Sequence, residues 1–99
     1  MSMDRLVNTT NKVADGTVKT GACIYLGLAL RATTAAAATV LVYDGTDATG
    51  ELIDEAQTEA GGGTVQGLIQ TGHKRHCTAG IYVDLGGTTP SVMIAWADA

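Results

Sequence analysis

Short apolar runs separated by glycine-rich turns most restrict what this chain can fold into. Residues 39–51 show the pattern best: the run 40–43 stops at Asp44-Gly45, and a second apolar pair, Leu52-Ile53, follows a polar connection. β-branched and aromatic residues favour strands, whereas Asp and Gly favour turns. This stretch therefore predicts a strand, a hairpin connection and the start of a second strand.

Residues 23–30 form the most apolar segment of the chain. Large and small side chains alternate along it, as in a strand with one bulky face. The large members, which this alternation predicts to face the core, are Ile24, Leu26, Leu28 and Leu30. Gly27 lies among the small members, and a glycine inside a strand marks a bend, a bulge or a close approach of another backbone.

Alternation with period two recurs in residues 81–85 and 91–97, whereas the alanine-rich residues 32–38 are too few for a stable helix. About eight short antiparallel strands separated by turns predict an all-β fold, either a β-sandwich or a jelly roll. Strand spacing also leaves an immunoglobulin-like topology open, although Trp96 follows both cysteines, unlike the order of a true immunoglobulin domain.

We expect two parts, an N-terminal arm (residues 1–16) and a single jelly-roll domain (residues 17–99). The chain has 99 residues, no Phe and one Trp, so its core is small and buries little area per residue. A small core predicts a marginal monomer that gains buried surface in an oligomer. The two cysteines flank apolar runs, which favours two reduced, packed thiols.

The net charge of −4 disfavours partners that carry negative charge. Nucleic-acid binding needs a basic face that neutralises phosphates, and attraction to an anionic membrane needs basic clusters. No apolar run is long enough to cross a bilayer, and the N-terminus has no apolar signal core. We expect a soluble protein made in the cytoplasm, with neither nucleic acid nor membrane as a partner.

Charge is unevenly distributed along the chain. Six acids and no Lys or Arg lie between Ala32 and His73, and one short basic run, residues 73–76, follows. The simpler interpretation is a solvated acidic side. The alternative is that the acidic segment of one copy meets Lys74 and Arg75 of the next copy in an oligomer.

Four segments together resemble a known class of protein. They are residues 21–28 (Gly-Ala-Cys-Ile-Tyr-Leu-Gly-Leu), 40–46 (Val-Leu-Val-Tyr-Asp-Gly-Thr), 79–87 (Ala-Gly-Ile-Tyr-Val-Asp-Leu-Gly-Gly) and 92–96 (Val-Met-Ile-Ala-Trp). This set is similar to small β-rich virion proteins of tailed bacteriophages, in particular the jelly-roll head-decoration (cement) proteins. The resemblance spans residues 21–96 and consists of strands and turns, without a catalytic signature.

The resemblance implies a structural protein synthesised in the host cytoplasm and placed on the capsid exterior. Such proteins are trimers at local three-fold positions, where they hold neighbouring major capsid subunits together. The expected contact residues are Met3, Arg5, Leu6 and Val7 in the N-terminal arm, with Lys74 and Arg75 in an exposed turn. Two alternatives are a tail or baseplate component and a surface jelly roll that binds host glycan.

One cluster of potential zinc ligands lies near the basic run. It comprises His73, His76 and Cys77, and Cys23 is a possible fourth member. The spacing matches no common zinc pattern, and a strand directs neighbouring side chains to opposite faces. We therefore interpret it as an exposed basic turn before a buried cysteine, and we expect no metal.

The oxygen-rich loop with Asp44, Asp47 and Glu51 offers calcium ligands, but it lacks EF-hand spacing and is better interpreted as a hairpin turn. The only serines, Ser2 and Ser91, lie outside any nucleophile elbow, so we expect no enzyme activity and no cofactor. Four aromatic residues offer a glycan platform, although packing within strands is the better interpretation. These residues are Tyr25, Tyr43, Tyr82 and Trp96.

Overall fold

The computed structural model describes residues 7–32, 37–58, 68–71, 74–87 and 90–99. These residues contain strands and turns and no helix, which confirms the all-β prediction. The strands are β1 (Asn8–Lys12), β2 (Gly16–Thr20), β3 (Cys23–Ala32), β4 (Ala38–Asp44), β5 (Glu51–Gln57), β6 (Leu68–Thr71), β7 (Arg75–Cys77), β8 (Gly80–Gly87) and β9 (Pro90–Asp98).

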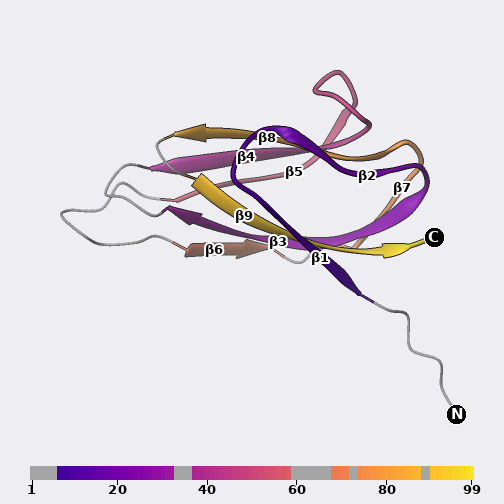
Figure 1. Ribbon diagram of the computed structural model, residues 1–99, viewed down its shortest axis with the longest axis horizontal. Helices are drawn as coiled ribbons and strands as arrows, with labels where there is room; N and C mark the ends of the chain where they lie inside the picture. Colours follow the sequence, from indigo (N-terminus) through magenta and orange to yellow (C-terminus); the bar gives the residue numbers. More distant parts are fainter. Residues whose placement is uncertain (1–6, 33–36, 59–67, 72–73, 88–89) are drawn as a thin grey trace, which may run out of the picture.

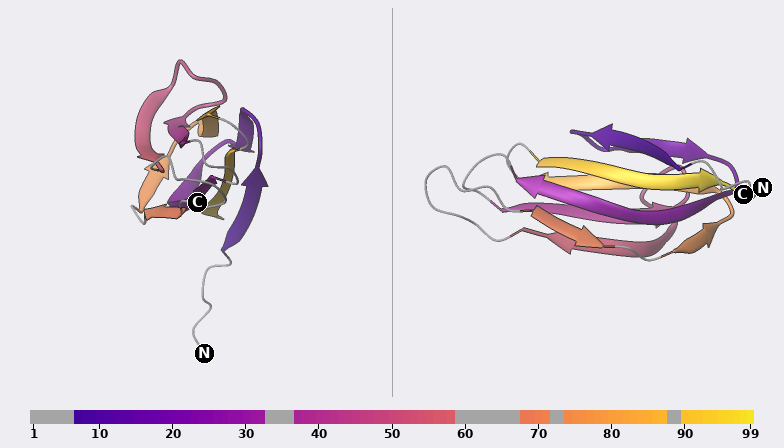
Figure 2. Two further views of the ribbon diagram at one scale, coloured as in Figure 1. Left: turned by 90° about the vertical axis from the view of Figure 1, so that its left-hand side faces the viewer. Right: turned by 90° about the horizontal axis from the view of Figure 1, so that it is seen from below.

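Two antiparallel sheets pack face to face, so the predicted β-sandwich is confirmed (Figure 1). Sheet A has the order β1-β9-β3-β6, and the short strand β7 also pairs with β3. Sheet B has the order β2-β8-β4-β5. The right-hand view of Figure 2 shows β9 between β1 and β3 in sheet A. The predicted hairpin is also confirmed, because β4 and β5 pair from Thr39 opposite Gln57 to Asp44 opposite Glu51.

The core lies between the sheets and follows the two-residue period of the strands. In β4, β8 and β9, fully buried residues alternate with residues that reach the outer faces. The buried members are Val40, Val42, Ile81, Val83, Val92 and Ile94. Each such side chain contributes about 1.5–3 kcal/mol by leaving water, so this alternation fixes which face of each strand is buried.

The predicted inward face of β3 is only half right. Leu28 and Leu30 belong to the core cluster, but at the start of the strand Cys23 and Tyr25 belong to it instead. Ile24 is buried as predicted, although it lies outside that cluster. The pairing with β9 shifts register between Tyr25 and Gly27, so Leu26 is an extra residue and the inward side changes there. Gly27 therefore marks a bulge, one of the alternatives that its position predicted.

The expected N-terminal arm is not confirmed. Within residues 1–16, the segment Asn8–Lys12 forms β1 and pairs along β9 at the edge of sheet A. Residues 1–6 lie outside the described residues. The remainder of the segment turns at Asp15, whose carboxylate accepts a hydrogen bond from the Leu85 backbone N–H at 2.6 Å, and enters β2 in sheet B.

Candidate interaction surface

Three turns meet at one end of the sandwich, which we call the turn end. They join β2 to β3, β4 to β5, and β7 to β8, and they lie together on the right of Figure 1. The Gly21 N–H donates to the Ala79 carbonyl at 2.9 Å, and the Gly45 N–H donates to the Gly80 carbonyl at 3.2 Å. The Thr17 hydroxyl donates to the Thr46 carbonyl at 3.2 Å. These bonds link turns that are far apart in the sequence, and together they hold the turn end in one arrangement.

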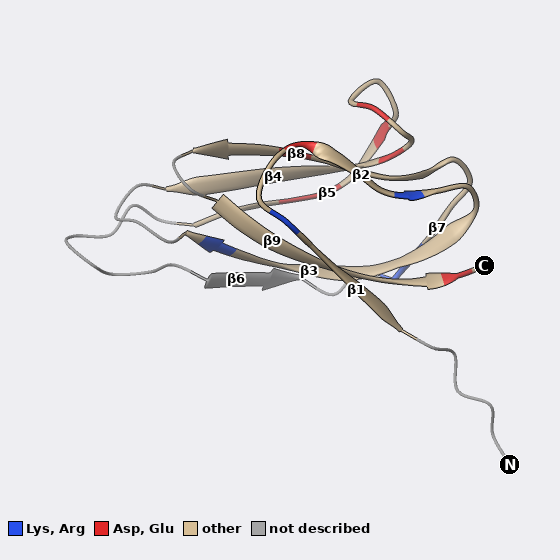
Figure 3. Ribbon diagram, viewed as in Figure 1, with Lys and Arg blue, Asp and Glu red and all other residues tan. Residues whose placement is uncertain are grey.

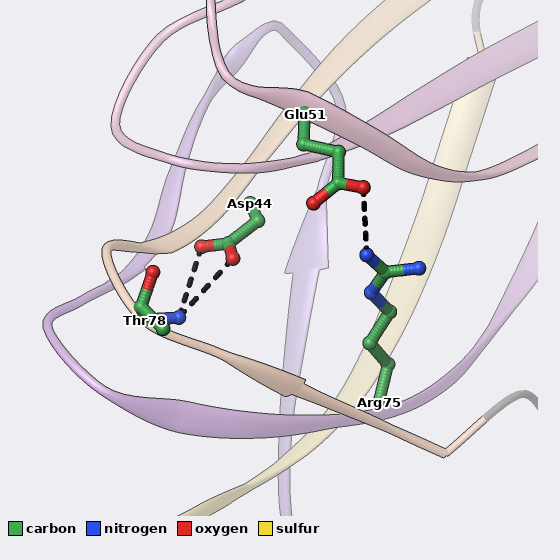
Figure 4. A network of polar contacts seen from close by, with 4 residues as sticks. All are labelled: Asp44, Glu51, Arg75 and Thr78. Atoms are coloured by element: carbon green, nitrogen blue, oxygen red, sulfur yellow. Dashed lines mark hydrogen bonds and ion pairs between the residues drawn. The ribbon is translucent and has the colours of Figure 1, made fainter.

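Asp44 is the central acceptor of the turn end. Its Oδ1 accepts hydrogen bonds from the backbone N–H groups of Ala79 at 3.0 Å and Thr78 at 3.2 Å, and its Oδ2 lies 3.1 Å from the Thr78 nitrogen (Figure 4). Burial alone would raise the pKa of Asp44, but hydrogen bonds from Ala79, Thr78 and Gly80 outweigh it and lower the pKa. The carboxylate therefore fastens the β7–β8 turn to the end of β4.

Arg75 finds its acidic partner within the same chain. Its guanidinium Nη2 lies 2.8 Å from Glu51 Oε2, and the two side chains are 43% and 64% exposed (Figure 4). The sequence suggested two interpretations of the acidic segment, solvation or contact with the basic run of a neighbouring copy. The structure adds a third arrangement, a contact between β5 and β7 of one protomer. Lys74, next to Arg75, is exposed.

Of the remaining expected contact residues, only Val7 is described, and it lies by the opposite edge of sheet A. Val7 directly precedes β1 and is 57% exposed, whereas Met3, Arg5 and Leu6 lie outside the described residues. The β1 and β7 edges are separated by β9 and β3. The register sets Asn8 opposite Trp96, Trp96 opposite Tyr25, and Tyr25 opposite Arg75. Val7 and Arg75 thus lie at opposite edges of sheet A, at about the same position along the strands.

Two rows of paired residues on the outer face of sheet A carry no charge, and the exposed Arg31 lies in the row beyond them. One row is Thr9, Ala95 and Gly27, and the next is Asn11, Met93 and Ala29. The side chain of Met93 is 48% exposed. Together with Leu26, several of these residues line a shallow hollow of about 210 Å³. The exposed Met93 and the small uncharged residues around it make this the candidate contact surface of sheet A.

The outer face of sheet B differs from that of sheet A in carrying aromatic and acidic residues. Tyr43 lies opposite both Tyr82 and Leu52, and the two tyrosine rings have centroids 6.4 Å apart at 51°. Desolvation raises the pKa of Tyr82, and the carboxylates of Asp15, Asp84 and Asp47 raise it further. Acidic residues gather over this sheet and its β4–β5 hairpin (Figure 3).

The other candidate residues are engaged in local contacts. The Tyr25 side chain is buried, and the Trp96 indole N–H donates to the Thr10 hydroxyl at 3.0 Å. Lys19 Nζ lies 5.3 Å from the centroid of the Trp96 ring and 3.5 Å from Asp98 Oδ1. Of the four aromatic residues considered for a glycan platform, only Tyr43 and Tyr82 share an outer face.

The described candidate metal ligands do not gather into one site, although Cys23 and Cys77 lie opposite each other. Asp47 accepts hydrogen bonds from the hydroxyl and the N–H of Thr49, and these two bonds lower its pKa. Cys77 lies opposite Cys23, whereas His76 lies opposite Ile24, and His73 is outside the described residues. Across the described part of the chain, no three His, Cys, Asp or Glu side chains are grouped to hold a metal ion.

Comparisons with known proteins leave this chain without an assigned family: no family model matches it, and a search of curated proteins finds no match either. Among the residues that the structure describes, there is no helix that could span a membrane.

Proposed function

We propose that this chain is a structural virion protein of a tailed phage that decorates the capsid exterior and links neighbouring major capsid subunits. The observation that carries the proposal is the pair of uncharged rows around Met93 on the outer face of sheet A, where Met93 is 48% exposed. A protein that works by contact needs an exposed apolar surface, and this face supplies one on a rigid sheet. The proposal also rests on the resemblance of residues 21–96 to decoration proteins.

We further propose that the sandwich is a jelly roll. A jelly roll distributes eight strands over two sheets, and it recurs in viral capsid and lectin domains. The orders β1-β9-β3-β6 and β2-β8-β4-β5 support this topology, with β7 as an addition beside β3. Successive strands alternate between the sheets except at β4–β5 and β6–β7, which fits the same topology.

The proposed mechanism is burial of apolar surface at a junction between capsid subunits. A chain that contacts two subunits at once adds the free energy of both contacts to the cost of separating them. In this proposal the outer face of sheet A, together with Val7 at the β1 edge, contacts the capsid or a second copy within a trimer. The acidic outer face of sheet B then remains in solvent and keeps the decorated particle soluble.

The test is binding to undecorated, expanded capsids of the phage that encodes this chain. Co-sedimentation and a rise in the melting temperature of the capsid are expected, and light scattering is expected to give a trimer. Met93→Glu should abolish co-sedimentation because it places a charge on the apolar face. Leu52→Glu, at the similarly exposed Leu52 on sheet B, is the matched control and should bind normally. Failure of the natural chain to bind, or equal binding by Met93→Glu, contradicts the proposal.

One observation favours a second candidate, a surface domain that binds host glycan. Tyr43 and Tyr82 lie side by side on the outer face of sheet B with carboxylates around them. Aromatic faces and carboxylates are groups that pack against and hydrogen-bond to sugars. A glycan array separates the two proposals: specific binding that Tyr82→Ala abolishes and Met93→Glu preserves would favour the glycan function over decoration.

A further inference from the structure

Two buried thiols face each other across neighbouring strands of sheet A. Cys23 begins β3, Cys77 ends β7, and the two residues are direct partners in the antiparallel ladder. Both are free cysteines, with exposed fractions of 0% and 2%. Each thiol affects the pKa of the other, as expected of neighbours across a ladder. The two cysteines are therefore paired by the register without a covalent bond between them.

The strand register gives this pair a backbone spacing suited to a disulfide. Directly opposite residues of antiparallel strands have Cα atoms about 4.5 or about 5.5 Å apart, depending on the type of pair. Disulfides form at Cα separations of about 4.4–6.8 Å, which includes both spacings. Their Cβ atoms must approach to about 3.5–4.5 Å, slightly closer than a typical cross-strand pair. β7 has three residues and, among the described strands, forms a ladder only with β3, so this small shift disturbs no other ladder.

We propose that Cys23 and Cys77 are a latent disulfide site, which a low-molecular-weight disulfide closes in the folded protein. The thiolate of one cysteine attacks the oxidant and releases one small thiol, which leaves a mixed disulfide on the protein. The second cysteine then loses its proton, attacks the protein sulfur of that mixed disulfide and releases the second small thiol. The two cysteines lose two electrons and two protons in total, and the oxidant is reduced to two thiols.

The surroundings of the pair make the reaction depend on local opening of β7. Burial raises the pKa of both thiols, that of Cys77 to about 12, so very little thiolate is present at neutral pH. On the flanks of β7, Arg75 is paired with Glu51. The carboxylate of Asp44 holds Thr78 and Ala79, immediately after the strand. The oxidant reaches the two sulfur atoms only when these contacts break and β7 opens locally. We therefore expect the disulfide to form slowly in the folded protein.

The bond would join the short strand β7 covalently to the middle of sheet A. Such a link forms in an oxidising environment and stays open in a reducing cytoplasm. If the chain is a virion protein, as proposed above, the bond would form after release from the host cell and stabilise the mature particle. This last consequence depends on the proposed function, whereas the thiol chemistry does not.

The experiment uses the purified full-length chain and a buffer of oxidised and reduced glutathione. Samples are oxidised in the folded state and, in parallel, refolded from denaturant in the same buffer, so that access to the thiols limits only the first set. Mass spectrometry is expected to show the loss of two hydrogen atoms, and a non-reducing digest should join the peptides that contain Cys23 and Cys77. The oxidised protein should melt about 10 °C or more above the reduced protein.

Single variants and one variant at the turn end complete the test. Cys23→Ala and Cys77→Ala should lose the oxidant-dependent rise in melting temperature while remaining folded by circular dichroism. In the folded Asp44→Asn variant, the disulfide should form about tenfold faster than in the natural chain, because the substitution weakens the contacts that hold the β7–β8 turn. Free thiols after refolding in oxidising buffer, a stable glutathione adduct, a bond between two chains, or a lower melting temperature after oxidation would each overturn the proposal.

Discussion

The hydroxyl of Tyr25 donates a hydrogen bond to Asp54 Oδ2 at 2.7 Å, and this bond joins the two sheets. Tyr25 belongs to β3 in sheet A, whereas Asp54 belongs to β5, an edge strand of sheet B. The ring of Tyr25 fills the core, and its hydroxyl reaches a carboxylate at the rim. A polar contact thus fixes how one edge of the sandwich closes over the apolar core.

Tyr25→Phe removes this hydroxyl and keeps the ring. A hydrogen bond to a charged group contributes about 1.5–3 kcal/mol, so we expect a loss of that size in the free energy of unfolding. Urea denaturation of the two proteins at neutral pH measures it. Tyr43→Phe, at a tyrosine on the outer face of sheet B, is the control and should change stability by less than about 0.5 kcal/mol. Equal losses in the two variants would show that the Tyr25–Asp54 hydrogen bond adds no stability beyond that of an exposed tyrosine hydroxyl.

Acid should weaken the fold partly through Asp44. Its pKa is lower in the folded than in the unfolded chain, so the unfolded state binds more protons as the pH falls. The contribution of Asp44 to stability is therefore present above its unfolded pKa, about 3.9, and is lost as the pH falls through the lower folded pKa. Asp44→Asn lacks this titration and should be less stable at pH 7 by about 1–3 kcal/mol.

Urea unfolding of the natural chain and of Asp44→Asn between pH 7 and pH 2 measures the difference. The gap in unfolding free energy should be constant near neutrality and should shrink as the pH falls below about 4. A gap that stays constant down to the lowest pH would contradict the assigned role of the carboxylate. Asp84→Asn is a suitable control, since Asp84 is an acid on the outer face of sheet B.

Gly80 should tolerate no side chain. Its φ of 140° lies in a region that favours glycine, and a Cβ there would collide with the Lys19 carbonyl oxygen. Gly80→Ala must therefore open the contact between β2 and β8 and should destabilise the fold by about 1–3 kcal/mol or more. Gly21→Ala is the matched control, because Gly21 also has a positive φ, of 94°, but has open space around its Cβ position.

Thermal unfolding ranks the two glycine variants. Both should lose stability through the backbone conformation, and Gly80→Ala should lose more because it adds the collision. If Gly21→Ala destabilised the protein as much as Gly80→Ala, backbone conformation alone would account for both losses. The close approach of the Lys19 carbonyl to Gly80 would then contribute nothing to the effect.

The hairpin at residues 39–51 was predictable because its signals are local. Val40 and Val42 alternate with outward residues, and Asp44 and Gly45 end the strand where turn residues are expected. Which side chains of β3 face the core was harder to predict from the sequence. Alternation predicts one phase for a whole strand, whereas the extra residue Leu26 reverses the phase within it.

The contacts of β7 were beyond prediction for a related reason. The sequence shows that Cys23 and Cys77 flank apolar runs, but the pair arises from the register of β3 with β7, which only the folded sheet sets. The same holds for Arg75 and Glu51, which meet because β5 and β7 lie at neighbouring edges of different sheets. Segregated charge along the chain predicted a solvated acidic side or, as the alternative, contact between two copies, and it did not predict a contact within one chain.

Exchange of the charges at Arg75 and Glu51 tests whether the ion pair forms within one chain or between two chains in solution. Arg75→Glu alone should lower the free energy of unfolding by about 1 kcal/mol or less, since exposed ion pairs contribute little, and the loss should shrink in salt. The double variant Arg75→Glu/Glu51→Arg should recover most of that loss if the pair forms within one protomer. Urea unfolding at low and high salt measures the recovery, with Lys74→Glu as a control at the neighbouring exposed position. Light scattering on the same samples should give an unchanged oligomeric state. Dissociation of an oligomer by Arg75→Glu would instead mean that Arg75 meets the acidic segment of another copy.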